Sequence, residues 1–122
     1  MPREAFIFTV EENGSASCEP ALNSHFVLVR VPLRLGSEGE RGEATVRYGI
    51  GSFAGREIAV ALGAGGHTTL CFRVPEELFR PRAHLAVEVL ARSGRGPQKL
   101  LWVKRWEVTR QGTAPHLEPI AD

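Results

Sequence analysis

Aspartate is almost absent from this chain, since its only copy is Asp122, the last of 122 residues. A Ser-His-Asp triad would therefore lack the carboxylate that usually orients its histidine, and an aspartate-rich calcium loop cannot be built. Hydrolysis by paired carboxylates would depend on glutamates, which cluster at 11–12, 38–43 and 76–77 in predicted loops and strand ends. Solvated charge is ordinary at such positions. We therefore predict no catalytic residues and a protein that is not an enzyme.

Cysteine and histidine are also scarce, with two and four copies. The chain has no C-x-x-C or H-x-x-x-H spacing of the kind that binds zinc, and His67 and Cys71 would lie about 13 Å apart on an extended strand. We therefore predict neither a metal site nor a cofactor. Cys18 falls in a polar loop and Cys71 in a predicted strand, and we expect two free thiols.

Long apolar runs are missing as well. The N-terminal run covers only residues 5–10, and no later segment approaches the roughly 18 apolar residues that a membrane-spanning helix needs. We expect a cytoplasmic protein without an export signal or a membrane span.

The chain is instead rich in turn residues between short apolar segments. Its 13 glycines and eight prolines favour turns and short strands over long helices. Residues 25–35 and 83–91 alternate with period two, which is typical of strands with one buried face. Pro32 cannot donate a hydrogen bond to a neighbouring strand, so we predict a sheet edge or a bulge at this point.

The remaining segments complete a series of strands. Residues 5–11 and 99–110 are predicted strands, with a bulge near Lys104 and Arg105 that would return both halves of the second strand to one core face. Residues 75–79 are predicted to form one helical turn. We expect a single domain over residues 1–110, followed by an irregular tail over residues 111–122.

The stretch from Ala44 to Pro75 has two interpretations. Gly49 to Ala54 fits the loose dinucleotide pattern G-x-G-x-x-A, which would require a helix over residues 52–62 and would suggest a nucleotide-binding enzyme. However, residues 56–62 also alternate with period two, and the predicted strand that ends at Pro75 lacks the acidic residue that would bind a ribose. We therefore favour consecutive strands and keep the nucleotide-binding enzyme as an alternative.

A sequence resemblance supports the all-β interpretation. The segment Gly63–Pro75, with its glycine turn and T-x-x-F-x-V-P strand, and the alternating segment Leu85–Val89 resemble bacterial immunoglobulin-like and fibronectin-type-III-like modules. The resemblance implies an all-β, immunoglobulin-like antiparallel β-sandwich of about seven strands. It also implies a role in adhesion, spacing or recognition, because such modules mostly have no catalytic residues.

Charge is unevenly distributed along the chain. Residues 1–77 have a net charge of −3, whereas residues 78–110 have a net charge of +6 and include Trp102 and Trp106. Basic groups beside aromatic rings can bind a phosphate backbone and stack bases. An alternative function is therefore a binding domain for an acidic polymer such as nucleic acid, or for a carbohydrate, through this C-terminal hairpin.

Apolar residues on faces opposite the predicted core suggest a different function. An apolar patch rimmed by arginine is typical of a protein interface. We therefore predict a non-catalytic interaction or assembly module that binds a protein partner or itself, with pairing of an edge strand as the mechanism. The predicted partner-binding residues are Phe26, Leu28, Arg30, Leu90, Trp102, Arg105 and Trp106.

Overall fold

Alternating apolar residues build ten strands in the computed structural model, which describes residues 7–21, 25–38, 42–55, 57–62, 67–92, 97–112 and 114–121. One three-residue 3₁₀ helix, η1 (Glu76–Leu78), follows the seventh strand. The strands are β1 (Ile7–Glu12), β2 (Ser17–Pro20), β3 (Phe26–Glu38), β4 (Gly42–Ile50), β5 (Phe53–Ala54), β6 (Ile58–Leu62), β7 (His67–Pro75), β8 (His84–Ala91), β9 (Lys99–Gln111) and β10 (Ala114–Pro119).

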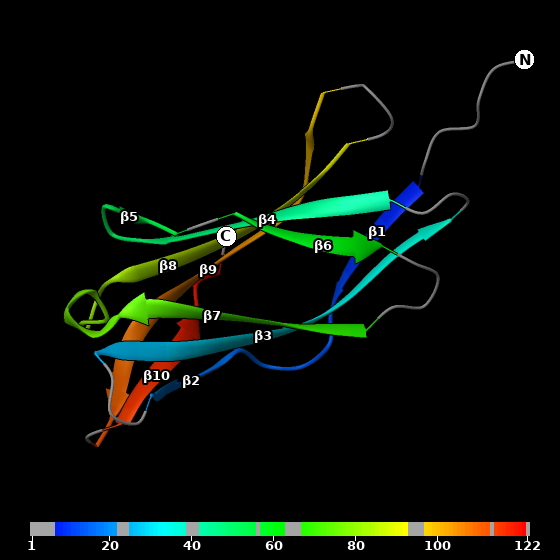
Figure 1. Cartoon of the computed structure of the whole chain (residues 1–122). Coiled ribbons are helices and arrows are strands. Elements are labelled where there is room, and N and C mark those ends of the chain that lie inside the picture. The colour runs from blue at the N-terminus through cyan, green and yellow to red at the C-terminus, as the bar shows by residue number, and fades with distance from the viewer. Residues whose placement is uncertain are drawn as a thin grey trace, which may run out of the picture.

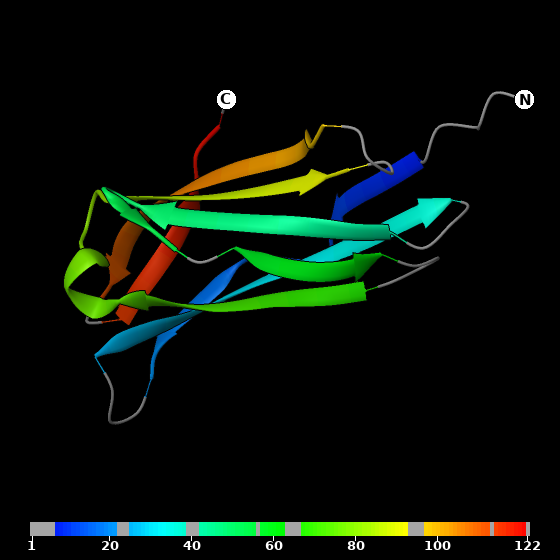
Figure 2. The same cartoon turned by 45° about the horizontal axis from the view of Figure 1, so that its top comes forward.

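The strands form two antiparallel sheets that pack face to face (Figures 1 and 2). In sheet A, β1 and β2 pair with one side of β3, and β7 pairs with its other side. In sheet B the order is β10-β9-β8-β4, and β5 and β6 both pair with β4. The predicted all-β sandwich is confirmed.

The core lies between the inner faces of the two sheets. Every second residue of β3 from Val27 to Leu35 is buried, as are Leu85, Val87 and Val89 of β8. Tyr48 of β4 stacks on Phe72 of β7 with 4.0 Å between ring centroids, so the aromatic rings join the two layers. Period-two alternation therefore predicted the buried residues of these strands.

The structure has ten strands where about seven were predicted. The first predicted strand and part of the loop after it form two short strands, β1 and β2, and β5 is a two-residue addition after the turn at Gly51 and Ser52. The prediction of an irregular tail is wrong for residues 114–119, which pair with β9 as β10. Leu117 explains this pairing, because its side chain is buried in the core with 4% of its surface exposed.

The glycine-rich stretch after β4 is a hairpin rather than the start of a helix. Gly51 has a φ of +55°, which few side chains tolerate, and it allows the chain to turn from β4 into β5. Gly55 donates its backbone N–H to the Tyr48 carbonyl at 2.8 Å, and a Cβ at Gly55 would lie 2.1 Å from the Tyr48 ring. Residues 53–54 and 58–62 are strands, so the nucleotide-binding alternative lacks the helix N-terminus that it requires.

Pro32 lies on an inner strand, so its predicted position at a sheet edge or a bulge is wrong. β1 pairs with residues 33–38 of β3 and β2 with residues 27–30, which leaves Pro32 opposite the break between them. The Pro32 carbonyl accepts a hydrogen bond from the Asn13 N–H at 3.0 Å. The missing N–H of proline therefore removes no bond between strands.

The bulge of β9 lies at Leu101 rather than near Lys104 and Arg105. Val89 of β8 faces Trp102, whereas Leu90 faces Leu100, so Leu101 is the extra residue. This shift turns Trp102, Lys104 and Trp106 toward the inside of the sandwich. The Lys104 side chain extends to the margin of the sandwich, where the Lys104 Nζ donates a hydrogen bond to Glu12 Oε2 at 2.8 Å.

Candidate interaction surface

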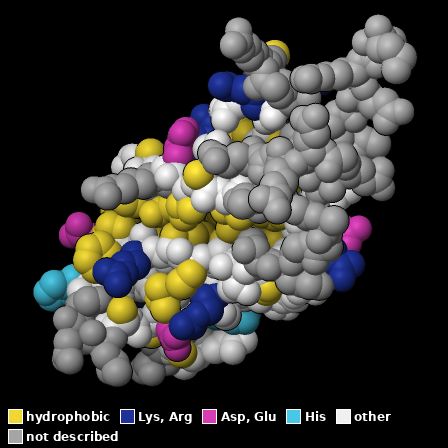
Figure 3. All heavy atoms as spheres, turned by 45° about the vertical axis from the view of Figure 1, so that its right-hand side comes forward, with side chains coloured by type: hydrophobic (Ala, Val, Ile, Leu, Met, Phe, Trp, Pro, Cys, Tyr) yellow, Lys and Arg dark blue, Asp and Glu magenta, His cyan; other side chains and the backbone are white. Residues whose placement is uncertain are grey.

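The outward-pointing residues of β3 and β7 form one surface, called here the outer face of sheet A. Phe26, Arg30, Arg34, Thr69, Cys71 and Arg73 are exposed on it, and Leu28 and Pro32 are half-buried. Phe26 has 40% of its surface exposed, and among the described large apolar residues only Leu100 of β9, with 52%, is more exposed. On the side of the molecule seen in Figure 3, apolar side chains form a band with Lys and Arg side chains at its margin. Apolar groups beside arginine have the composition of a protein interface.

Arginines on this face lie beside both charged and uncharged side chains. Arg30 forms an ion pair with Glu19 of β2, and this hydrogen bond raises the pKa of the Arg30 guanidinium. Arg30 also faces Cys71 across the β3–β7 ladder, and Arg73 faces Leu28. In these two successive facing pairs of the outer face of sheet A, an arginine therefore lies opposite an uncharged residue.

β7 borders the outer face of sheet A and is an edge strand. Among the described strands it pairs only with β3, over all nine of its residues. The Glu76 N–H donates to the His25 carbonyl at 2.8 Å, which identifies the facing residues Phe26 and Pro75 as a pair without mutual hydrogen bonds. Because bonded and non-bonded pairs alternate along an antiparallel ladder, Thr69, Cys71 and Arg73 point their N–H and C=O groups away from β3. These three residues define the β7 edge.

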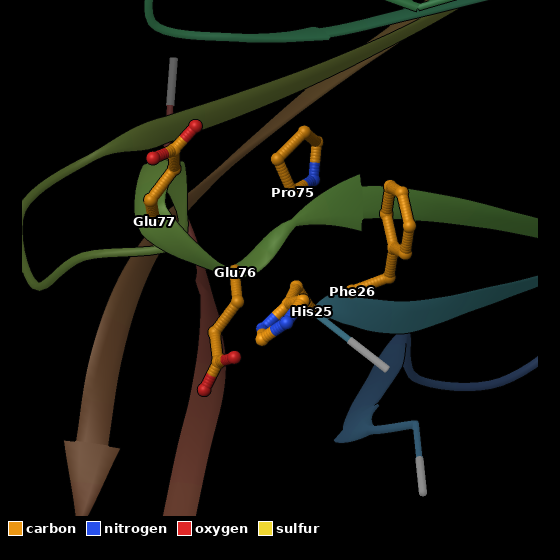
Figure 4. A pocket seen from close by; sticks show the side chains of 5 residues that line it. All are labelled: His25, Phe26, Pro75, Glu76 and Glu77. Atoms are coloured by element: carbon orange, nitrogen blue, oxygen red, sulfur yellow. The ribbon is translucent and has the colours of Figure 1, made fainter. Parts of the chain in front are cut away.

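A hollow of about 570 Å³ lies where β7 ends, between His25 and Phe26 on one side and Pro75, Glu76 and Glu77 on the other. In Figure 4 the Phe26 ring stands beside Pro75, the Glu76 side chain extends on the side of His25, and Glu77 points away from both. An apolar wall with nearby carboxylates suits a side chain that has an apolar stem and a basic end.

The structure divides the seven predicted partner-binding residues among three places. Phe26, Leu28 and Arg30 lie together on the outer face of sheet A. Leu90 and Arg105 belong to the opposite outer face, that of sheet B, where Leu90 lies between Thr45 and Leu100 with only 6% of its surface exposed. The seven predicted residues therefore do not lie on a single sheet face.

The two tryptophans lie on the inner face of sheet B. Trp106 is buried with 3% of its surface exposed, and Trp102 is half-buried and packs against the core. Their ring centroids are 6.4 Å apart. Both tryptophans point inward because the extra residue Leu101 shifts the inward and outward alternation of the residues that follow it in β9.

The prediction missed Thr69 and Arg73 as surface residues of a free edge. Their alternation with Leu70, Phe72 and Val74 was visible in the sequence and separated the exposed from the buried side of β7. No pattern in the sequence indicated that β7 would end a sheet, because strand order depends on contacts between distant segments.

The two cysteines lie on opposite faces of sheet A, and neither is in a disulfide. Cys18 of β2 faces Val29 and packs against the core, whereas Cys71 faces Arg30 and is exposed. Burial raises the pKa of the Cys18 thiol to about 11. Because they lie on opposite faces of sheet A, the two cysteines do not form a disulfide with each other.

Within the described ranges, no group of three or more His, Cys, Asp or Glu side chains could bind a metal ion. The same residues include no helix with the length and apolar character needed to cross a bilayer.

Comparisons with known proteins add nothing to this geometry. No family model, curated protein or solved structure matches the chain.

Proposed function

We propose that the protein is a non-catalytic interaction or assembly module that binds a protein partner, or a second copy of itself, through the outer face of sheet A and the β7 edge. The observation that supports this most is a nine-residue strand, β7, that pairs on one side only among the described strands and lies beside exposed Phe26. An open strand edge can pair with another chain through backbone hydrogen bonds, and neighbouring side chains add specificity.

We also propose that the sandwich is of the immunoglobulin and fibronectin-type-III kind. Immunoglobulin domains place strands A, B and E in one sheet and strands C, F and G in the other. If β1 and β2 are counted together as strand A, then β3 and β7 occupy the places of B and E, and β4, β8 and β9 those of C, F and G. Such modules mostly function in recognition, which agrees with the proposed role.

The alternative of an acidic polymer or carbohydrate ligand has less support. It needs the tryptophans of the basic hairpin to stack on a ligand at the surface. Trp106 is buried and Trp102 packs against the core. We therefore do not propose that function.

Site-specific photocrosslinking in the cell that makes the protein tests the proposal. A photoreactive amino acid replaces Leu28 on the outer face of sheet A or, as a matched control, Val103 on the outer face of sheet B. Both positions are half-buried on strands. We expect discrete protein adducts, identified by mass spectrometry as the chain itself or as another protein, from position 28 and not from position 103.

Two results would contradict the proposal. Equal labelling from both positions would mean that the adducts reflect random collisions. The absence of adducts at position 28, in cells where the protein is abundant, would mean that this face is not an interface.

A further inference from the structure

We infer that the partner at the β7 edge is a second copy of this chain, which pairs β7 with β7 in antiparallel orientation so that Cys71 faces Cys71 of the second copy. This inference rests on the proposed function and names the partner of the same surface. The two strands would join the two copies of sheet A into one continuous sheet around a two-fold axis.

The backbone of the β7 edge can form this ladder without rearrangement. Thr69, Cys71 and Arg73 already point their N–H and C=O groups outward, and none of them is proline. In the inferred register Thr69 faces Arg73 of the second copy, and Cys71 faces Cys71. Residues that point toward the partner strand form bonded pairs, so the three facing pairs exchange about six hydrogen bonds, two per pair.

The register follows from the length and charge of β7. The strand His67–Pro75 overlaps a second copy along its whole length only when its central residue, Cys71, lies on the two-fold axis. This register also places the uncharged Thr69 opposite Arg73. A pairing centred on Arg73 would instead place two arginines directly opposite each other, which is unfavourable.

The other sheet edges explain why two copies would meet through β7. β1, β5 and β6 have six, two and five residues, all fewer than the nine of β7, and β2 has four residues and ends in Pro20. β10 contains Pro115 and Pro119, which have no N–H to donate. A symmetric β7 pair covers the long open edge of both molecules at once, whereas unpaired molecules would leave it exposed to aggregation.

Cross-linking through Cys71 tests the register directly. The full chain with Cys18→Ser retains a single thiol, and a short-armed bis-maleimide joins two thiols without redox chemistry. We expect rapid formation of a covalent dimer, because facing residues of a bonded pair have Cα atoms about 5.5 Å apart. The matched control, Cys18→Ser with Cys71→Ser and Thr69→Cys, keeps a thiol on the same exposed face. In the inferred register these control thiols are four residues apart along the ladder, so we expect little cross-linking.

A charge substitution at Thr69 gives a second, reversible measurement by sedimentation equilibrium. Thr69→Glu places a carboxylate opposite Arg73 of the second copy twice per dimer, and we expect dimerisation about fivefold tighter. Thr69→Lys should weaken it by a similar factor. Adding Arg73→Glu to Thr69→Lys places opposite charges across the ladder again and should tighten dimerisation to about the level of Thr69→Glu, which a purely structural effect of either substitution would not do.

The outcomes separate this inference from the proposed function. A monomer at every concentration, equal cross-linking from positions 69 and 71, or the same dissociation constant for the Glu and Lys variants would each overturn β7 self-pairing. If photocrosslinking at position 28 still yields adducts with another protein, the interaction module stands and only the identity of its partner was wrong. If Cys71 cross-links while position 28 yields no adducts, self-pairing stands and the outer face of sheet A is not part of the interface.

Discussion

The edges formed by β7 and β10 obey the same rule of hydrogen-bond alternation but have opposite chemistry. The Ile120 N–H donates to the Arg105 carbonyl at 3.0 Å, which identifies the facing residues Trp106 and Pro119 as a pair without mutual bonds. Pro115, Leu117 and Pro119 therefore point their backbone groups away from β9. Two of these three residues are proline, so this edge offers a single N–H donor, from Leu117.

At the β7 edge the corresponding residues are Thr69, Cys71 and Arg73, and each of them has an N–H. An edge strand can therefore pair with another chain only where the residues whose N–H groups point outward are not proline. Proline at the alternate residues, whose N–H groups point toward the neighbouring strand, would instead remove hydrogen bonds within the strand's own sheet.

The largest expected effect comes from truncating Leu117, the side chain of β10 that is buried in the core. Leu117→Ala leaves a cavity in the core, and we expect a loss of about 3 kcal/mol in the free energy of unfolding, measured by chemical denaturation. β10 should also detach more often from β9. Hydrogen exchange should then accelerate at Glu107, Thr109 and Gln111, whose N–H groups point toward β10, more than at Val108, whose N–H donates to Ala83 at 2.8 Å.

An exposed position on the same strand provides the control for this prediction. Glu118→Ala removes a side chain at the surface and should leave both stability and exchange nearly unchanged. If exchange in Leu117→Ala accelerated equally at all residues from 106 to 111, the N–H groups that point toward β10 would not be those of Glu107, Thr109 and Gln111.

Cys71→Pro gives the β7 edge the same protection that β10 has. The Cys71 N–H points away from β3, so proline removes no bond to β3, and we expect a modest loss of stability from backbone strain alone. We expect self-association to weaken at least about tenfold, because two hydrogen bonds per dimer are lost.

Sedimentation equilibrium measures this effect, and Cys71→Ala is the control that keeps the N–H. If Cys71→Pro and Cys71→Ala associate equally, backbone pairing at the β7 edge does not drive association.

The reverse substitution should open the β10 edge. Replacing both Pro115 and Pro119 by threonine supplies the two missing N–H groups and favours strand conformation. We expect a small increase in aggregation on mild heating, visible as light scattering, while the unheated chain keeps its fold. Unchanged scattering would show that some other feature, such as the short length of β10, protects this edge.

The smallest effect concerns the thiols on the two faces of sheet A. Burial raises the pKa of Cys18 to about 11, so the unfolded chain releases this proton at lower pH than the folded chain does. The free energy of unfolding should be unaffected by Cys18 at neutral pH and should fall as the pH rises from about 8.5 toward that value. Cys18→Ser should remove this part of the pH dependence.

Alkylation followed by mass spectrometry offers an independent measurement of the same contrast. At mildly alkaline pH, Cys18 should react on the order of tenfold more slowly than Cys71, which is exposed beside the β7 edge. Equal rates of alkylation would mean that the packing of Cys18 against the core does not protect its thiol.

Period-two alternation was enough to predict the all-β class and the buried faces of β3 and β8. These features depend on neighbouring residues along one strand. The sequence did not reveal which strands end a sheet, nor that a bulge at Leu101 would turn Trp106 inward, because both depend on pairing between distant segments. For the same reason Phe26, Leu28 and Arg30, which share one strand, were correctly grouped, whereas the predicted face that joined them to β8 and β9 was not.

The pairing of β3 has a consequence for folding during synthesis. Its partners on one side, β1 and β2, precede it in the chain, but its partner on the other side, β7, begins only at His67. Closing this long connection costs chain entropy before any pairing is gained, so sandwiches of this kind fold slowly. While the chain emerges from the ribosome, β3 would therefore expose an unpaired edge, together with valines that are buried in the folded protein. The nascent chain is most vulnerable to misassembly in the interval before β7 is made.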